Sequence, residues 1–407
     1  MKIFVTALLL CAGALPPRLH ALPPAGGALT LESALALVSA SNPELAGARR
    51  RLGLLEAEEI SAGARPNPRL EAEAGGGDYE FKLSQPVPLA RVASTAGAAA
   101  RAAAGAARRE LEALETRLHG AARKAWYGLR IARERRGFEE THLKSSMDIL
   151  GKIELRLQTG EAGNADLARA KVEVSRSRFH LQEAAAAWSA AAGELNALMG
   201  RRPEAALEIS PDDGFSLAPE PAEPEPLEKY TGLALARRAE LRALDLELES
   251  SGLAVKLEKG RRLPVPEIGL IRGSSDGTSY SRLFFGLELP LWYGNRGELR
   301  RALALQSALG GEQLRLELEI RREVYAAWLE LGLARSRLAS ARETVFLLND
   351  LRRSASQAYL SGKTDLAAFY ETNRVFLEEN INYLDALKDY YERTAQMEAA
   401  VNGREAK

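Results

Sequence analysis

The chain has 407 residues, enough for two or three ordinary domains or for one large repetitive one. Lys and Arg together number 55, as do Asp and Glu, so no net charge favours a nucleic-acid partner. Aromatic residues make up only 6% of the chain, while alanine, leucine, glutamate and arginine abound, a mixture typical of long helices and coiled coils.

The N-terminus carries the features of a secretory signal peptide. A positive start is followed by an apolar run from Ile3 to Leu10 and then by small residues. Cleavage after Ala14 and cleavage after Ala21 both fit this pattern, and we assign 1–21 to the signal peptide. Cys11, the only cysteine, is a poor candidate for lipid attachment because a leucine precedes it where a small residue is expected.

The prolines divide the chain. All 18 lie outside 89–202 and 291–407. Because a proline inside a helix costs about 3 kcal/mol, these two stretches can form long helices. Apolar residues recur in them every three or four positions, as at Leu314 and Leu318. We predict helical hairpins over 89–202 and 295–403, with arms of about 65 residues that reach roughly 100 Å.

A strand-like segment precedes each helical stretch. The segment 69–86 surrounds a glycine-rich turn, and 266–290 surrounds a second one, so each predicts a β-hairpin. The strands of the first hairpin have about seven residues each, fewer than the roughly 9–11 needed to cross a bilayer. Alternation predicts that its four charged residues share one face, opposite the apolar residues; these are Glu71, Glu73, Glu80 and Lys82.

The same landmarks occur twice in the same order. Asn42-Pro43-Glu44-Leu45 corresponds to Arg238-Ala239-Glu240-Leu241, and each is expected in a short opening helix. Thr159-Gly160-Glu161 corresponds to Ser361-Gly362-Lys363, and each is expected to turn the chain at the tip of a helical hairpin. Ordered landmarks of this kind indicate an internal duplication.

The duplication predicts two repeats, 29–202 and 227–403, joined by the proline-rich acidic linker 203–226. The two hairpins supply only four strands, whose open edges one chain cannot close. We therefore expect several copies to assemble in a ring, since a closed barrel has no edges.

These landmarks resemble the TolC family of outer-membrane efflux proteins over about 29–403. The resemblance rests on both tip turns and on three short motifs, Leu29-Thr30-Leu31-Glu32-Ser33-Ala34-Leu35, Arg65-Pro66-Asn67-Pro68 and Leu83-Ser84-Gln85-Pro86. A further phrase, Leu289-Pro290-Leu291 followed by Asn295-Arg296-Gly297, is similar to the heavy-metal branch of the family, which serves resistance-nodulation-division (RND) pumps.

The resemblance implies a mainly α fold with a small β part. In a protein of this kind, three chains would form a twelve-stranded β-barrel in the outer membrane and an α-barrel of long helical hairpins in the periplasm. The far end would meet a periplasmic adaptor and an inner-membrane RND pump. Because the pump would supply the energy, the chain is expected to be a passive duct without enzymatic activity or cofactor. Its expected cargo is heavy-metal cations or small toxic compounds.

The resemblance also places an acidic aperture on the helix that follows the second tip turn. Glu371 and Asp365 are its candidates, and Ala368 stands where relatives carry another acid. In a trimer, Glu371 would form a ring of three carboxylates able to attract cations. The alternative is a solvated Glu371 that pairs with Arg374 at i+3.

The tip turns match the turns that contact the adaptor in relatives. The docking candidates are Gly160, Asp166, Leu167, Gly362, Asp365 and Leu366. The alternative is that the glycines serve turn geometry and the aspartates cap helices. Both can hold, because a capped turn is also a surface on which another protein can dock.

No motif for catalysis or metal binding competes with this interpretation. His20 falls within the predicted signal peptide, and the other three histidines, His119, His142 and His180, are expected at solvated helix positions. Four mid-rod aromatic residues are expected to pack between helices; they are Trp126, Tyr127, Tyr325 and Trp328. An exported trimeric coiled-coil scaffold that bridges the envelope without conducting is the main alternative, although a scaffold needs neither β-hairpins nor an ordered duplication.

Overall fold

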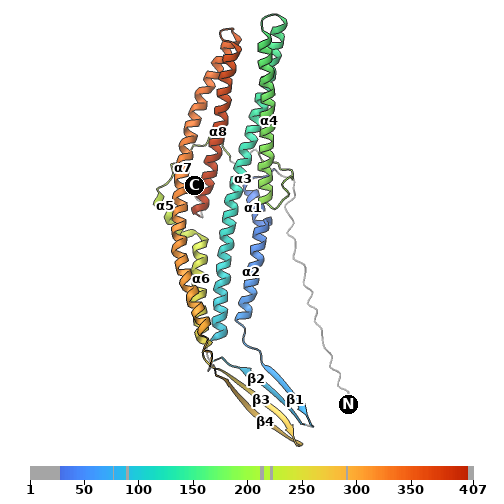
Figure 1. Cartoon of the computed structure of the whole chain (residues 1–407), viewed down its shortest axis with the longest axis vertical. Helices are drawn as coiled ribbons and strands as arrows, with labels where there is room; N and C mark the ends of the chain where they lie inside the picture. Colours follow the sequence, from blue (N-terminus) through green and yellow to red (C-terminus); the bar gives the residue numbers. More distant parts are fainter. Residues whose placement is uncertain are drawn as a thin grey trace.

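The computed structural model of the chain describes residues 28–401, except 77, 89–90, 211–214, 221–222 and 290–291. The predicted signal peptide and Cys11 lie outside the described residues. Two elongated halves run side by side, with a sheet at one end and two helical tips at the other (Figure 1). The predicted fold class, long helices with one small sheet, is confirmed.

Each half contains four helices and one β-hairpin among the described residues. The first half comprises α1 (Leu31–Ser41), α2 (Pro43–Ala62), β1 (Arg69–Gly75), β2 (Asp78–Pro86), α3 (Val92–Gln158) and α4 (Asn164–Leu198). The second half comprises α5 (Leu227–Arg237), α6 (Ala239–Gly260), β3 (Val265–Ser275), β4 (Thr278–Glu288), α7 (Arg296–Leu360) and α8 (Leu366–Val401).

Two unbroken helices, α3 with 67 residues and α7 with 65, run the length of the rods. Beside α3 lie α4 towards the tip and α2 towards the sheet, and beside α7 lie α8 and α6 in the same arrangement (Figure 1). The helix α3 also packs against α6 and α8, so it joins the two halves. This leaves α2 and α4 along one lateral edge and α7 along the other.

The short opening helix expected in each half is in fact two helices, so this detail of the prediction is wrong. The chain breaks at Asn42 (φ −63°, ψ 127°) and at Arg238 (φ −60°, ψ 126°) with the same extended backbone. At the first break, the Asn42 side chain accepts a 2.9 Å bond from the amide of Glu44, and Pro43 begins α2. A side chain that caps the next helix therefore ends the previous one.

The sheet is an antiparallel meander in the order β1-β2-β3-β4. Its register aligns Leu70, Leu83, Leu270 and Leu283 across all four strands. The neighbouring row on the other face contains Glu71, which pairs with Lys82 at 3.2 Å. The predicted separation of charged and apolar faces in the first hairpin is confirmed by this register.

The linker between the halves is held against the rods by aromatic side chains. Phe215 lies 5.1 Å from the ring of Tyr391 and 6.5 Å from that of Tyr127. Trp328 donates from its indole nitrogen to the carbonyl of Glu225 at 3.1 Å. Two of the predicted mid-rod aromatic residues thus fasten the linker. No helix in the described part of the chain is both long and apolar enough to cross a membrane.

The remaining two mid-rod aromatic residues differ from each other. Trp126 is buried in the cluster formed by α1, α3 and α4, as predicted. Tyr325 is half exposed on α7, at the open lateral edge, so in a single chain it does not pack between helices. The difference arises because α3 has neighbours on both sides and α7 has them on one side only.

Stability should depend on the α3 core. Leu129 is fully buried, and Leu129→Ala should lower the free energy of unfolding by about 2–5 kcal/mol because it leaves a cavity. Leu217→Ala removes the same atoms from a linker side chain that is 44% exposed, and should cost about 1 kcal/mol or less. Chemical denaturation of the purified protein measures both values; equal losses would contradict this assignment of the core.

Candidate docking tips and aperture

The two tip turns have the same backbone geometry. Gly160 and Gly362 adopt left-handed conformations, with φ of +77° and +72°. In each turn the residue after the glycine donates its amide to the carbonyl five positions earlier, at 2.8 Å. This pattern ends a helix and satisfies its last carbonyl groups. The glycines predicted at the tips therefore have a demonstrated structural role.

The two aspartates predicted at the tips cap the returning helices. Asp365 accepts a 2.8 Å bond from the amide of Ala368 at the start of α8. Asp166 accepts a 3.4 Å bond from the amide of Gly163 at the start of α4. Both carboxylates lie at the positive end of a helix dipole, which stabilises them there. Asp365 thus serves the helix terminus, and its role in an aperture stays a prediction.

The two leucines predicted for docking pack inward. Leu366 is only 4% exposed and lies in a cluster with Ile153, Ala170 and Phe369, while Leu167 packs against the same cluster. This cluster holds the two tips together at one end of the rods (Figure 1). The exposed residues of the tips include Gly160, Gly362 and Asp365, and their role in docking stays a prediction.

Aromatic residues strengthen this contact between the tips. Tyr359 stacks on Phe369 with 5.2 Å between ring centroids, and Arg156 of the first tip lies 6.0 Å from the Tyr359 ring. Sequence reasoning did not single out these residues. The available signal was the closely spaced group of aromatic residues near the second tip, but nothing in the sequence placed the first tip against it.

Glu371 is exposed and forms a two-pronged pair with Arg374. The Arg374 guanidinium donates to the two oxygens of Glu371 at 2.7 and 3.2 Å, and to Glu378 at 3.3 Å. These hydrogen bonds from Arg374, together with its positive charge, hold the pKa of the Glu371 carboxyl below its usual value. The alternative drawn from the sequence, a solvated Glu371 paired at i+3, is therefore realised in the single chain. Each chain presents two carboxylates and one guanidinium on this stretch of α8.

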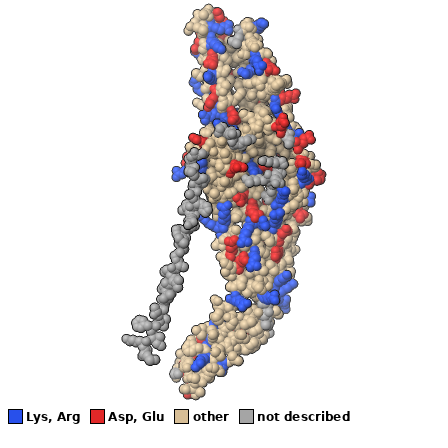
Figure 2. Space-filling view, turned by 180° about the vertical axis from the view of Figure 1, so that it is seen from behind, with Lys and Arg blue, Asp and Glu red and all other residues tan. Residues whose placement is uncertain are grey.

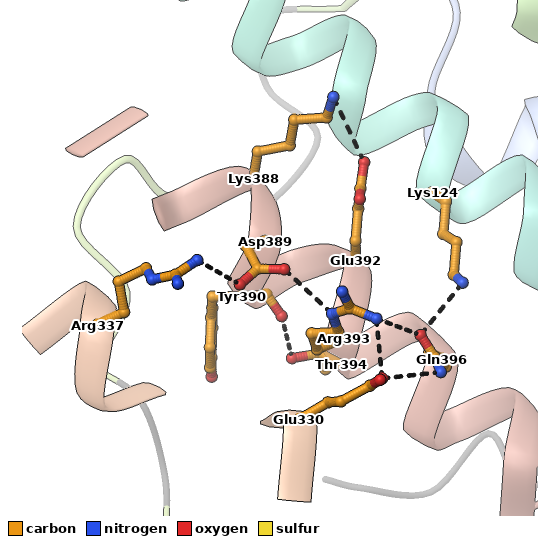
Figure 3. Close-up of polar contacts among 10 residues, drawn as sticks. All are labelled: Lys124, Glu330, Arg337, Lys388, Asp389, Tyr390, Glu392, Arg393, Thr394 and Gln396. Atoms are coloured by element: carbon orange, nitrogen blue, oxygen red, sulfur yellow. Dashed lines mark hydrogen bonds and ion pairs between the residues drawn. The ribbon is translucent and has the colours of Figure 1, made fainter. Parts of the chain in front are cut away.

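A polar network joins the halves near the middle of the rods (Figure 3). At its centre Arg393 of α8 bonds to Asp389 at 3.0 Å and to Glu330 of α7 at 2.8 Å. Gln396 accepts from Arg393 at 3.1 Å and from Lys124 of α3 at 3.4 Å. Arg393 therefore links α8 to α7, and Gln396 links both to α3. Asp389 also lies 3.5 Å from the guanidinium of Arg337 on α7.

His142 was expected to be solvated, and this expectation is wrong. The imidazole is buried between α3 and α4, with Nδ1 3.8 Å from Glu139 and Nε2 3.7 Å from Glu173. Packing of α4 over this face of α3 buries it. By contrast, His180 is exposed, as predicted. Among the described residues, no group of three or more His, Cys, Asp or Glu side chains has a geometry able to hold a metal ion.

Comparison with known proteins extends over nearly the whole chain. The cobalt-zinc-cadmium resistance protein CzcC of Cupriavidus metallidurans is 24% identical over 383 residues, which cover 90% of this chain and 88% of the relative. The chain also superposes on CusC, which forms a transmembrane channel, with a TM-score of 0.76, 14% identity and 92% of each chain covered. The Vibrio cholerae outer-membrane protein VceC gives a TM-score of 0.75 at 16% identity, covering 92% of this chain and 96% of VceC.

The chain has the fold of the TolC family of outer-membrane efflux channels. The resemblance first seen in the sequence is thereby confirmed. No family model matches the chain. The solved relatives OprN and CusC form channels, which agrees with the non-enzymatic duct expected from the sequence.

The tip glycines can be tested by one substitution made at two sites. Gly362→Ala should destabilise the protein by about 1 kcal/mol or more, because an L side chain is strained at a positive φ. Gly151→Ala lies within α3, in open space at an ordinary helical φ, and should stabilise it by roughly 0.4–1 kcal/mol. Thermal unfolding of both variants gives the signs; two shifts of the same sign would contradict the turn assignment.

Proposed function

We propose that this chain is the outer-membrane exit duct of a tripartite RND-type efflux system and works as a homotrimer. The observation that carries the proposal is that the sheet and the helical rods both lack neighbours at the same two lateral edges of the chain. The sheet ends in β1 and β4, and the rods end in α2 with α4 and in α7. A ring of copies can cover the edges of the sheet and of the rods at the same time.

The strand edges require a partner. The outer backbone groups of β1 and β4 have no ladder neighbour within the described chain. Such groups favour pairing with another strand, and in a membrane an unpaired backbone group is costly. Pairing β4 of one copy with β1 of the next removes every edge. Four strands from each of three chains would form a twelve-stranded barrel.

The rod edges carry exposed apolar side chains over most of their length. On α7 these include Leu303, Leu305, Leu314, Leu318, Leu329, Leu333, Phe346 and Leu347. On the opposite edge they include Leu54 and Ile60 of α2 and Val172 and Phe179 of α4. Burying apolar surface contributes roughly 25 cal/mol per Å², and a patch this long favours association. The two edges face each other when copies are arranged around an axis.

The faces of the sheet suit a wall between lipid and water. One face carries Leu70, Phe81, Leu270, Leu283 and Phe285 in register, and these side chains are exposed in the single chain. The other carries charged pairs such as Lys82 with Glu71. The space-filling view shows few charges over most of the sheet (Figure 2). An envelope scaffold that does not conduct would need no such wall.

The tips would dock the periplasmic adaptor, with Gly160, Gly362 and Asp365 in the contact. Their exposure and their position at the far end of the rods support this role. The inner-membrane pump behind the adaptor would drive transport. Heavy-metal cations are the proposed cargo, and the similarity to CzcC, a cobalt-zinc-cadmium resistance protein, supports this choice.

The cargo can be tested in cells. Deleting the gene should lower the tolerated concentration of cobalt, zinc or cadmium while leaving tolerance to organic drugs nearly unchanged, because the duct would serve a metal pump. The minimal inhibitory concentrations of each metal and drug provide the measurement, with the restored gene as control. Lost drug tolerance alone would contradict the metal assignment but keep the duct. Unchanged tolerance to both, with the partner pump expressed, would contradict efflux.

The aperture can be tested by single-channel recording. Glu371→Ala removes three carboxylates from the trimer and deprives Arg374 of one of its acidic partners. The preference of the channel for cations over anions should therefore fall by roughly twofold or more. Glu154→Ala removes an exposed carboxylate on α3, on a helix outside the proposed aperture, and should leave selectivity unchanged. Equal selectivity in the wild type and Glu371→Ala would show that Glu371 is not part of the constriction.

A further inference from the structure

We propose that the junction between the sheet and the rods is a basic collar that binds the phosphate groups of anionic phospholipids. The collar consists of Arg65, Arg91, Lys259, Arg261, Arg262, Arg296, Arg300 and Arg301, all exposed. The proposal rests on the proposed function, because it requires that the sheet lies in the outer membrane. It adds that the lipids around the junction between the sheet and the rods carry anionic phosphate headgroups.

The collar concentrates positive charge in a chain whose net charge is zero. Its segments, 63–66, 91, 258–262 and 292–301, hold eight Lys and Arg and only two acidic residues, Glu258 and Glu298. Lys and Arg gather in this region where the sheet meets the rods (Figure 2). Three copies around an axis would form a continuous belt of one sign.

The acids near the collar do not neutralise it. Glu258 pairs with Arg261 at 2.8 Å and also accepts from Asn295. In the part of the chain that the structure describes, neither Arg262 nor Arg296 forms an ion pair. The same holds for Arg65 at the far side of the junction. These side chains are accordingly available to an external anion.

An exposed tryptophan and its neighbouring tyrosine indicate where the collar lies relative to the membrane interface. Trp292 is 98% exposed, and Tyr293 beside it is fixed by accepting a 3.2 Å bond from the amide of Gly297. They follow the exposed apolar residues Phe285 and Leu287 of β4. Tryptophan and tyrosine favour the boundary between acyl chains and headgroups. The apolar face, the aromatic pair and the collar therefore follow one another in the order of a membrane interface.

A second copy of the chain is a poorer occupant of this surface. Copies related by rotation bring identical collars to the same level, and like charges in contact repel. An anionic headgroup supplies the missing charge, and each arginine near a membrane surface contributes about 1 kcal/mol of attraction. The rods extend from the collar into the periplasm, so the leaflet concerned is the inner one, which consists of phospholipid.

The test measures which lipid contacts Trp292 in the reconstituted full-length protein. Vesicles contain brominated phosphatidylglycerol or brominated phosphatidylcholine at the same mole fraction, and bromine quenches nearby indoles. The Trp292→Phe variant isolates the signal of this residue from the other three tryptophans. We expect half-maximal quenching of Trp292 at a roughly fivefold lower fraction of phosphatidylglycerol, the ratio that 1 kcal/mol corresponds to.

The charge dependence has a matched control. R262Q/R296Q removes two of the eight collar charges and should lower this preference measurably while Trp292 stays quenched. R169Q/R353Q removes two exposed arginines near the tips and should leave the preference intact. Raising the salt concentration to about 0.5 M should weaken the preference, because headgroup attraction is screened.

The outcomes separate the two proposals. Protein that floats with vesicles but is quenched equally by both lipids overturns the collar and keeps the membrane duct. Protein that floats but whose Trp292 is not quenched by either lipid also overturns the collar, since another protein surface then covers this residue. Protein that does not float with vesicles overturns the proposed function itself.

Discussion

The lateral packing of very long helices is the constraint on which this structure depends. A helix of 67 residues is about 100 Å long and has no interior of its own, so its apolar side chains need neighbours along the whole length. The helix α3 finds them in α2, α4, α6 and α8. The helix α7 finds them on one side only. That asymmetry is what leaves the rods incomplete as a single chain.

The duplication meets this constraint by using the same arrangement of helices and turns in both halves. Each half lays two shorter helices beside one continuous helix, α2 and α4 beside α3, and α6 and α8 beside α7. The breaks that separate α1 from α2 and α5 from α6, at Asn42 and Arg238, have nearly the same backbone angles. The tips repeat one turn, with Gly160 and Gly362 in the same conformation. Because both halves have the same shape, their lateral edges lie at matching heights. A repeated unit of this kind can be continued by further copies around a ring.

Features set by local chemistry were predictable from the sequence. The absence of proline indicated the rods, glycine indicated the tip turns, and alternation in 69–86 indicated the two faces of the first hairpin. Features set by distant partners were not. The burial of His142 depends on α4, and the burial of Leu366 depends on the opposite tip. A single sequence shows the period of an apolar stripe but not which helix covers it.

The neutral composition illustrates the same limit. Equal numbers of acidic and basic residues argue against a global field, yet they say nothing of where the charges lie. Along the chain, the apolar face of β4 is followed by the exposed Trp292 and then by the exposed arginines of 296–301. A protein that crosses an interface needs surfaces of different charge at different depths. Their charges cancel when they are summed over the whole chain. The charge that matters for its partners is therefore local, and it becomes visible only when the segments 258–262 and 292–301 are brought together by the fold.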